Sequence, residues 1–494
     1  MLTYLTIASL LVSGAFYIAL SIRLHRNAVA LDDHLPLTSG RQARVMNSAE
    51  FSAATVATTI SLATVILAYA ELASFLGLWL LWTVITTAIG ILVVRFVAPR
   101  IWRRLAQFGQ GRPTLHGFLG YSFDSSLLMR SAAICTSLGF LGALAVELTV
   151  GSRFLAALAP GISSLVSVPL IAAIGVAYTM LGGFRAVVIT DRVQMAAIWA
   201  AIAALFIAIY FIAQASGGIS QTIGLLPKDI YDFSWREGLA SFLVGIFIIN
   251  VPTFLADMSI WQRIAATPSE RIVTSGLWSS VFQAAASWSC LAILSVLLVG
   301  VVAPEEGVNP LFTFMRQIGT SGVPVLLSCF VVGVVGLYAA SLSTASTQLI
   351  AAGHTLHTDL LRPQKTEGRS LDDPSELAFS RTLLLVTSVA SVIVVWILTE
   401  AGFSIADLVF AVYGAQLGLV PVVLLALFVD RSALRNLAPW AAAAALVGFL
   451  SGWGSAAVGK IYGIGDLVFL APAASLIASA AILGVGWIAA GRAR

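Results

Sequence analysis

The stretch Ala340-Ser341-Leu342-Ser343-Thr344-Ala345-Ser346-Thr347 carries hydroxyl groups into a long apolar segment. Four of its residues recur at the spacing i, i+3, i+4, i+7 that marks one face of a helix, namely Ala340, Ser343, Thr344 and Thr347. Neutral oxygens at membrane depth suit a small monovalent cation, because such ions take oxygen ligands and must be able to leave again. A structural interpretation also exists, since small hydroxyl residues let membrane helices approach each other closely.

The composition places the whole chain in a membrane. Hydrophobic residues make up 59% and charged residues only 10% of the sequence, and the mean hydropathy is +0.96. Apolar runs of 18 or more residues recur along the chain, each long enough to cross roughly 30 Å of hydrocarbon. We therefore expect an all-α protein of the cell membrane, with the lipid bilayer as its surroundings. The net charge of +4 is mild, so no nucleic-acid partner and no obligate protein partner is inferred.

Counting the apolar runs predicts about 13 transmembrane helices. Their approximate cores are 2–22, 50–76, 78–99, 127–158, 163–182, 191–214, 237–262, 272–303, 323–353, 380–400, 404–429, 437–455 and 466–490. Arg23 follows the first run instead of preceding it, so this run is a retained span and not a cleavable signal peptide. With the N-terminus outside and the C-terminus cytosolic, the inward loops hold twenty Lys and Arg residues and the outward loops five. This alternation agrees with the positive-inside rule.

Two spans carry signs of a broken helix. The second is dense in hydroxylated residues from Thr55 to Thr64, and the seventh contains Asn250-Val251-Pro252-Thr253. The two are five spans apart, so they would begin two five-helix units of opposite topology, an architecture of transporters with a ligand site at the midplane. The predicted units are 1–49 (an extra span and a cytosolic loop), 50–214 (first inverted repeat), 237–429 (second inverted repeat) and 430–494 (two peripheral spans).

Enzymatic activity is not expected. The loops are too short for a soluble domain, and no Ser/His/Asp, paired-Asp or His-rich constellation lies at a common depth. Two alternatives to ion-coupled transport stay open. One is a proton-coupled carrier of the same fold, with Asp191 or Glu147 titrating during the cycle. The other is a ligand-sensing membrane module that acts with a separate signalling partner.

Several motifs resemble those of the sodium/solute symporter family. The longest contains Tyr178-Thr179, Gly182-Gly183-Phe184, Ala186-Val187, Thr190-Asp191 and Gln194. Gln262-Arg263 and the stretch from Ala339 to Thr344 are similar to two further elements of that family. The resemblance covers about residues 40 to 430. It implies a leucine-transporter-type fold and secondary active transport, with sodium-coupled symport of a small organic solute into the cell by alternating access.

The resemblance also implies cation sites. For a principal sodium ion, the second span would offer the carbonyls of Ala57 and Ile60 where its helix unwinds. The ninth span would add the carbonyl of Ala340 and the hydroxyls of Ser343 and Thr344. A second sodium site, nearer the cytosol, would use Asp191, Ser343, Ser346 and Thr347. For Asp191 a helix N-cap is the structural alternative. One sodium ion, and at most two, is therefore the expected cofactor.

By the same resemblance, the solute site should lie among the second, fourth, seventh, eighth and eleventh spans. Six residues there offer neutral hydrogen-bonding groups: Thr64, Asn250, Thr253, Gln283, Tyr413 and Gln416. The run Leu62-Ala63-Thr64-Val65-Ile66-Leu67 is too apolar to favour a sugar. Without a central Arg or Lys, an anionic substrate would need a helix N-terminus and the sodium ion as counter-charges. The interpretation preferred here is an amino acid or a small carboxylate.

Overall fold

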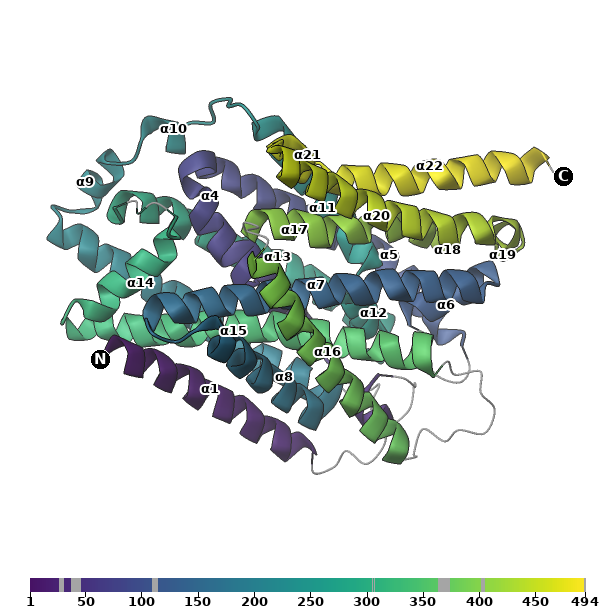
Figure 1. Ribbon diagram of the computed structural model, residues 1–494, viewed down its shortest axis with the longest axis horizontal. Coiled ribbons are helices and arrows are strands. Elements are labelled where there is room, and N and C mark those ends of the chain that lie inside the picture. Colours follow the sequence, from purple (N-terminus) through teal and green to yellow (C-terminus); the bar gives the residue numbers. More distant parts are fainter. Residues whose placement is uncertain are drawn as a thin grey trace.

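The computed structural model describes residues 1–25, 31–36, 46–108, 114–303, 305, 307–362, 374–400 and 405–492. Within these ranges the chain forms helices and no strand, which confirms the expected all-α class. Eleven helical stretches there are long and apolar enough to cross a membrane. Most of them extend along the long axis of the molecule, and the two termini lie toward opposite ends of it (Figure 1). Seven of the loop cations counted above lie outside the described residues: Arg26, Arg41, Arg44, Arg112, Lys365, Arg369 and Arg494.

Side chains at helix starts explain where several spans begin. Before α3 (Ser48–Thr59), Asn47 accepts the Glu50 amide at 2.9 Å, and the Glu50 carboxylate accepts the Asn47 amide at 3.0 Å. This reciprocal pair is a capping box, which satisfies two amides that the first helical turn leaves free. Ser125 caps α7 (Ser126–Leu158) in the simpler way, by accepting the Leu128 amide at 3.2 Å.

Helix α8 (Ser164–Ala215) contains two membrane crossings joined at Gly183, where the backbone leaves helical geometry with φ 60° and ψ −160°. Tyr178, before this point, donates to the Leu342 carbonyl of α15 (Pro324–Thr355) at 2.7 Å. Beyond it, Asp191 contacts Ser343, and Gly336 packs against the segment around Ala201. The first half thus follows the direction of α15 and the second half opposes it. Residues 183–190, which the predicted spans 163–182 and 191–214 leave between them, are helical beyond the turn at Gly183.

The second span is interrupted, as expected. It consists of α3, a π-helical turn η1 (Leu62–Leu67) and α4 (Ala68–Leu76), and the third span follows through η2 (Gly77–Leu80) into α5 (Leu81–Ala106). The stretch Leu62–Ala106 therefore contains parts of two predicted spans, although it forms one of the eleven apolar stretches. Because α8 also contains two crossings, the eleven helical stretches can contain the 13 predicted transmembrane helices. The exact number of crossings stays a prediction.

The seventh span is also interrupted, but not at the expected place. Helix α11 (Leu239–Ala256) continues through Pro252, and the break follows at Asp257, before α12 (Met258–Ala265). The Asp257 carboxylate accepts the Ser259 amide at 2.7 Å, so it caps the second segment. An interior proline removes one backbone hydrogen bond, and here the helix absorbs that loss. The helix therefore ends where a side chain competes for the backbone amides.

The remaining helices complete the bundle. The longer ones and α19 are α1 (Leu2–His25), α6 (Leu115–Phe123), α13 (Glu270–Val301), α14 (Pro310–Thr320), α16 (Pro374–Glu400), α17 (Ile405–Gln416), α18 (Val420–Phe428), α19 (Arg431–Leu434), α20 (Ala438–Tyr462) and α22 (Ala471–Arg492). Four short helices connect them: α2 (Leu31–His34), α9 (Ile219–Gly224), α10 (Lys228–Tyr231) and α21 (Gly465–Phe469). The division into two five-helix repeats with flanking segments stays a prediction.

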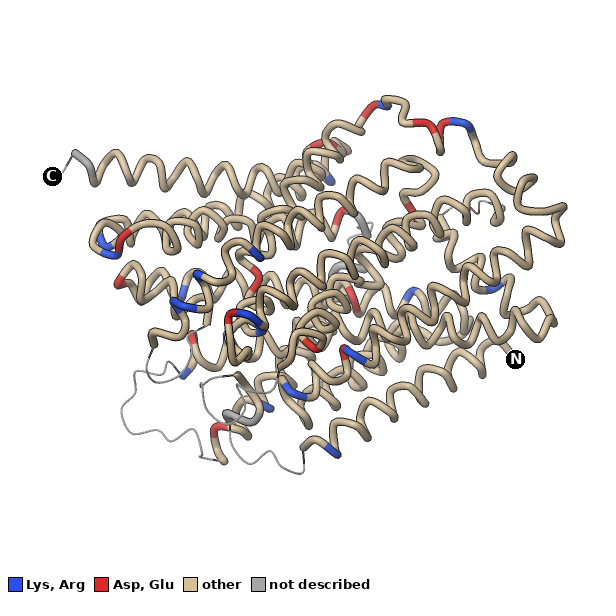
Figure 2. Tube along the Cα trace, turned by 180° about the vertical axis from the view of Figure 1, so that it is seen from behind, with Lys and Arg blue, Asp and Glu red and all other residues tan. Residues whose placement is uncertain are grey.

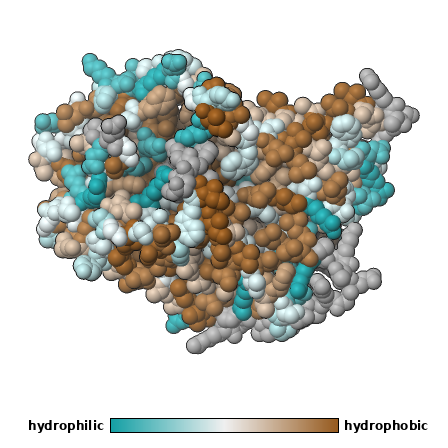
Figure 3. Space-filling view, viewed as in Figure 1, coloured by the Kyte–Doolittle hydropathy of each residue, from teal (hydrophilic) through white to brown (hydrophobic). Residues whose placement is uncertain are grey.

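Helix α15 occupies the interior of the protein. Every residue from Gly336 to Thr355 is buried, so the hydroxyl-rich stretch faces protein and not lipid. The outer surface carries broad apolar areas (Figure 3) and long helical segments without any charged residue (Figure 2). A belt of this kind matches the hydrocarbon of a bilayer, whereas the hydroxyls inside must serve contacts within the molecule.

Candidate functional site

The break in the second span exposes backbone carbonyls in the protein interior. Helix α3 ends at Thr59, and Ile60 (φ −88°, ψ 71°) and Ser61 (φ −73°, ψ 145°) are not helical. The last carbonyls of a helix lack partners within it, so those of Ala57 and Thr58 point out of the end of α3. Ala57 and Ile60 are buried. Oxygens in this position need a donor or a cation.

Helix α15 meets this break through Thr344. The Thr344 hydroxyl lies 3.5 Å from the Thr58 carbonyl and 3.1 Å from the carbonyl of Ala340. The two groups of predicted sodium ligands therefore come from elements in direct contact. Coordination of a sodium ion by Ala57, Ile60, Ala340, Ser343 and Thr344 stays a prediction, which this contact supports.

A second polar cluster on α15 adjoins this contact and shares Ser343 with the predicted sodium site. Ser343 donates to one carboxylate oxygen of Asp191 at 2.7 Å, and the other oxygen has no hydrogen-bond partner among the described residues. The Ser346 hydroxyl donates to the Ser343 carbonyl at 3.1 Å. Asp191 is buried within α8 and does not begin a helix, so the N-cap alternative is wrong.

Arg263 of α12 enters this cluster from the other side. Its guanidinium donates to the Thr347 hydroxyl at 3.3 Å and to the Ser259 hydroxyl at 3.3 Å. A cation bound by Asp191 and Thr347 would face this positive charge. A second sodium ion at this cluster, formed by Asp191, Ser343, Ser346 and Thr347, stays a prediction that requires the guanidinium to withdraw from Thr347.

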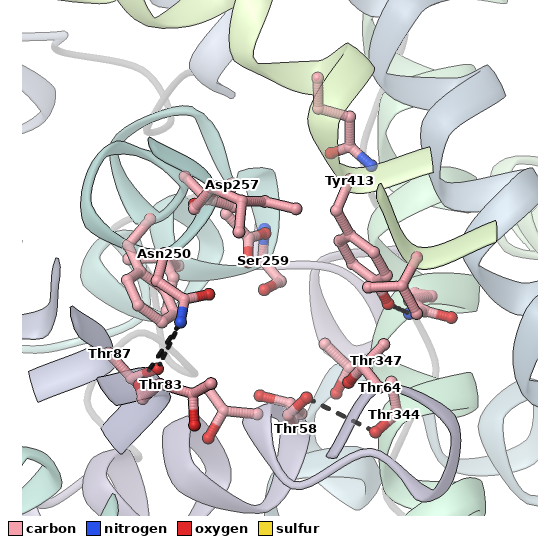
Figure 4. A pocket seen from close by; sticks show the side chains of 18 of the residues that line it. Thr58, Thr64, Thr83, Thr87, Asn250, Asp257, Ser259, Thr344, Thr347 and Tyr413 are labelled. Atoms are coloured by element: carbon pink, nitrogen blue, oxygen red, sulfur yellow. Dashed lines mark hydrogen bonds between the residues drawn. The ribbon is translucent and has the colours of Figure 1, made fainter. Parts of the chain in front are cut away.

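A cavity of ≈ 160 Å³ lies beside the two breaks. It is lined by five of the six residues predicted to contact the solute: Thr64, Asn250, Thr253, Tyr413 and Gln416. Thr58 and Thr344 line it as well, so the cavity and the predicted sodium site share a wall. Figure 4 shows Asn250 and Tyr413 on opposite sides of the space, with Thr58 and Thr344 along another edge.

Gln283 is the exception, since it does not line the cavity. Helix α13 contributes Trp288 instead, five residues further on. Five residues turn an α-helix by about 140°, so the two side chains leave α13 on different faces. The expectation that Gln283 takes part in this cavity is therefore wrong.

Two amides of the site are already positioned by protein contacts. Asn250 donates to the hydroxyls of Thr86 at 3.0 Å and Thr87 at 3.1 Å, which ties α11 to α5. Gln348 donates to the Tyr413 hydroxyl at 2.8 Å, which ties α15 to α17. These bonds fix the cavity wall on both sides and leave the amide carbonyls to face a solute.

Sequence reasoning missed Gln348 and the aromatic part of the lining. Gln348 follows Thr344 by four residues, so the helical period that found the hydroxyl face also predicts Gln348 on it. Tyr69, Phe140, Phe254 and Trp288 also line the cavity, and no pattern distinguishes them from core aromatics. Asp257 is the only Asp, Glu, Lys, Arg or His of the lining, so the cavity is largely neutral.

Glu147 of α7 contacts the break in the second span. It is buried, and its carboxylate accepts a hydrogen bond from the Ser61 hydroxyl. The backbone amides of Leu62 and Ala63 and the hydroxyl of Ser341 also face this carboxylate. A negative charge at amides that begin a helical segment is stabilising. Glu147 therefore holds the start of η1 in place.

Two interrupted helices around a buried polar cavity define the class of the protein: a multi-pass secondary transporter of the leucine-transporter type. The family model described as the sodium:solute symporter family matches residues 40–448, and the chain belongs to that family. It is therefore a transporter and not an enzyme, and it couples the movement of a small solute to sodium.

Individual relatives agree with this assignment. The high-affinity proline transporter PutP of Bacillus subtilis (strain 168) is 24% identical over 382 residues, which cover 76% of each chain. The sodium/sialic acid symporter NanT of Aliivibrio fischeri (strain ATCC 700601 / ES114) is 25% identical over 244 residues, 47% of each chain. A solved structure of a Na⁺-coupled sialic acid symporter, substrate-bound and outward-open, matches with a TM-score of 0.76 and 19% identity over 99% of this chain and 98% of that one.

Proposed function

We propose that this protein carries an amino acid or a small carboxylate into the cell by alternating access, with the solute in the ≈ 160 Å³ cavity. The driving sodium ion would bind between the end of α3 and α15. One observation carries this proposal: Thr344 both contacts the unwound end of α3 and lines the cavity. An ion held there would touch the solute site directly.

The neutral lining supports a solute whose charge is balanced by the ion. A carboxylate would meet hydroxyl and amide donors, and the sodium ion would supply the counter-charge that no Arg or Lys of the lining provides. The ammonium group of an amino acid would be attracted by Asp257. The relatives are named for proline and for sialic acid, which supports a carboxylate-bearing solute.

Sodium coupling provides enough free energy for uphill transport. One cation crossing 100 mV releases about 2.3 kcal/mol, and a tenfold concentration gradient adds about 1.4 kcal/mol. A single ion could therefore concentrate a neutral solute on the order of 500-fold. Coupling requires that ion and solute together favour the state that closes over them, because equal affinity for both states shifts nothing. One sodium ion per cycle is the minimum that the proposal needs, and a second at the Asp191 cluster would raise the ratio further.

The orientation belongs to the same proposal. The cation-rich ends of the spans would face the cytosol, with the N-terminus outside and the C-terminus inside. Accessibility of single cysteines to a membrane-impermeant reagent, placed at exposed positions such as Leu127 and Tyr462, tests this orientation directly.

The decisive experiment has two stages. A thermal-shift screen of amino acids and small carboxylates, with and without sodium, identifies a solute whose stabilisation requires sodium. Uptake of that solute into proteoliposomes is then measured under an imposed sodium gradient. We expect accumulation that disappears when potassium or choline replaces sodium. Accumulation that follows a pH gradient in sodium-free buffer would favour the proton-coupled carrier, and ligand binding without uptake would favour the sensing module.

A further inference from the structure

A second cavity lies at the end of the bundle that the sequence predicts to be cytosolic. Its volume is ≈ 280 Å³, and it is enclosed by the end of α5, by α6, by the end of α18 and by α19. Two guanidinium groups line it, those of Arg104 and Arg431, together with the aromatic rings of Phe108 and Tyr121. The solute cavity shares no residue with it, so any ligand here is separate from the transport substrate.

Arg431 is held in a fixed position at this cavity. Its guanidinium lies over the Tyr121 ring, 3.8 Å from the centroid, and 3.6 Å from the Asp124 carboxylate. Its Nε is buried and has no hydrogen-bond partner among the described residues. A buried N–H without an acceptor is costly, so the ion pair and the ring contact leave the donors of this guanidinium incompletely satisfied.

The cavity lies in a locally positive region. Arg100 and Arg435 flank the two arginines of the lining, with Arg100 over the Phe428 ring at 4.8 Å and Arg435 at 3.4 Å from Asp124. Asp124 is paired with both Arg431 and Arg435, so one carboxylate is shared by two cations. The excess positive charge favours an anion. Because guanidinium groups present paired N–H donors, they match the oxygens of a phosphate.

The surroundings of the cavity favour an anion that belongs to a lipid. Phe428 at the end of α18 is 54% exposed, and Phe96, one turn before Arg100 on α5, is 74% exposed. Such large exposed apolar side chains mark surface that faces hydrocarbon. The cavity therefore lies where the apolar belt ends, which is the depth of lipid phosphates.

We propose that this cavity binds the phosphate of an anionic glycerophospholipid, held by Arg104 and Arg431. The acyl chains would lie along the apolar surface of Phe428 and Phe96, and Tyr121 and Phe108 would line the glycerol part of the headgroup. Basic pockets between transmembrane helices on the cytoplasmic side recognise anionic headgroups in this manner. The site joins α5 and α6 to α18 and α19, so an occupied site would brace this end of the bundle.

Native mass spectrometry of the full chain in detergent tests the proposal, with phosphatidylglycerol and phosphatidylcholine added at equal concentration. We expect retained phosphatidylglycerol in excess over phosphatidylcholine. Arg104→Gln should lower that retention roughly fivefold, the effect of one arginine near an anionic lipid phosphate. Arg104 makes no hydrogen bond or ion pair through its side chain with another described residue, so this variant should fold normally. Arg431→Gln should have a similar effect on retention.

The control is Arg192→Gln, since Arg192 is exposed and lies outside both cavities. Its lipid retention should equal that of the unsubstituted protein. Equal phosphatidylglycerol retention in Arg104→Gln, Arg431→Gln and the unsubstituted protein would overturn the site. The lipid assignment would be overturned if glycerol 3-phosphate raised the unfolding temperature as much as phosphatidylglycerol does. The cavity would then bind the phosphate of a soluble ester.

Discussion

Ser61, in the break of the second span, donates its hydroxyl hydrogen to the Glu147 carboxylate of α7. The two residues are 86 positions apart in the chain and both are buried. This bond joins the part of the second span that must unwind to a helix of the surrounding bundle. It explains why the unwound segment keeps a defined conformation inside the protein.

Glu147→Gln is therefore expected to destabilise the protein by about 1–3 kcal/mol, the cost of leaving buried donors without a full partner. The neutral amide can still accept from Ser61, but its NH₂ group would face the amides of Leu62 and Ala63. Thermal unfolding in detergent measures the effect. The matched control is Glu237→Gln, at an exposed position, which should leave the unfolding temperature unchanged. Equal unfolding temperatures for both variants would contradict the role given to Glu147.

Removing a hydroxyl at the predicted sodium site should weaken sodium binding. For Ser343→Ala and Thr344→Ala we expect the sodium concentration for half-maximal uptake to rise about tenfold, which corresponds to about 1.4 kcal/mol. Ser328→Ala is the control, because Ser328 lies on the exposed end of the same helix and its hydroxyl bonds only the Pro324 carbonyl. If the sodium concentration for half-maximal uptake were the same in all three variants, the proposed sodium site would be wrong.

The Asp191 cluster can be tested separately from the principal site. If a second ion binds there, Asp191→Asn should reduce the Hill coefficient for sodium to about one while leaving sodium-dependent uptake in place. The carboxamide keeps an acceptor for Ser343 and removes the negative charge. A Hill coefficient of one in the unsubstituted protein, unchanged by the substitution, would limit the protein to one sodium ion.

Substitutions of two glutamines, one inside and one outside the cavity lining, test whether the solute binds in this cavity. Gln348→Ala removes the donor to Tyr413 and one polar group of the wall, so we expect the KM for the solute to rise about tenfold, the effect of losing about 1.4 kcal/mol of binding. Gln283→Ala should leave KM unchanged, because Gln283 does not line the cavity. The reverse order of effects would show that the solute binds elsewhere.

Gly183 is expected to tolerate no other residue. Its φ of +60° disfavours side chains, and an added Cβ would lie 2.6 Å from the His34 carbonyl oxygen. Gly183→Ala should therefore lower the free energy of unfolding by about 1–3 kcal/mol. This effect would be measured as a reduced yield and a lower unfolding temperature. Gly484→Ala, in α22 with open space around the added Cβ, should be neutral or stabilise slightly.

Much of the fold and of the site follows from local sequence. Apolar length predicts the spans, and the helical period of the hydroxyl stretch predicts which face of α15 meets the broken helix. The hydroxyl-rich segment around Thr58 also marks the first break correctly, since such side chains weaken regular helix.

The errors have one physical source, which is that local patterns do not record tertiary partners. Pro252 suggested the second break, yet the helix ends at Asp257, where a carboxylate competes for the next amides. Gln283 is polar and lies on a predicted site helix, but the rotation of α13 places Trp288 at the cavity instead. The role of Glu147 needs a partner 86 residues away, and no spacing rule connects it to Ser61.

The single-residue reversal at Gly183 has a practical consequence for topology mapping. An epitope tag or protease site inserted there would have to displace His34 and split two packed crossings, so its failure would say nothing about which side of the membrane it faces. Gly218, after the end of α8, has open space around an added Cβ and lies between the exposed residues Gly217 and Ile219, so an insertion there meets no packed crossing.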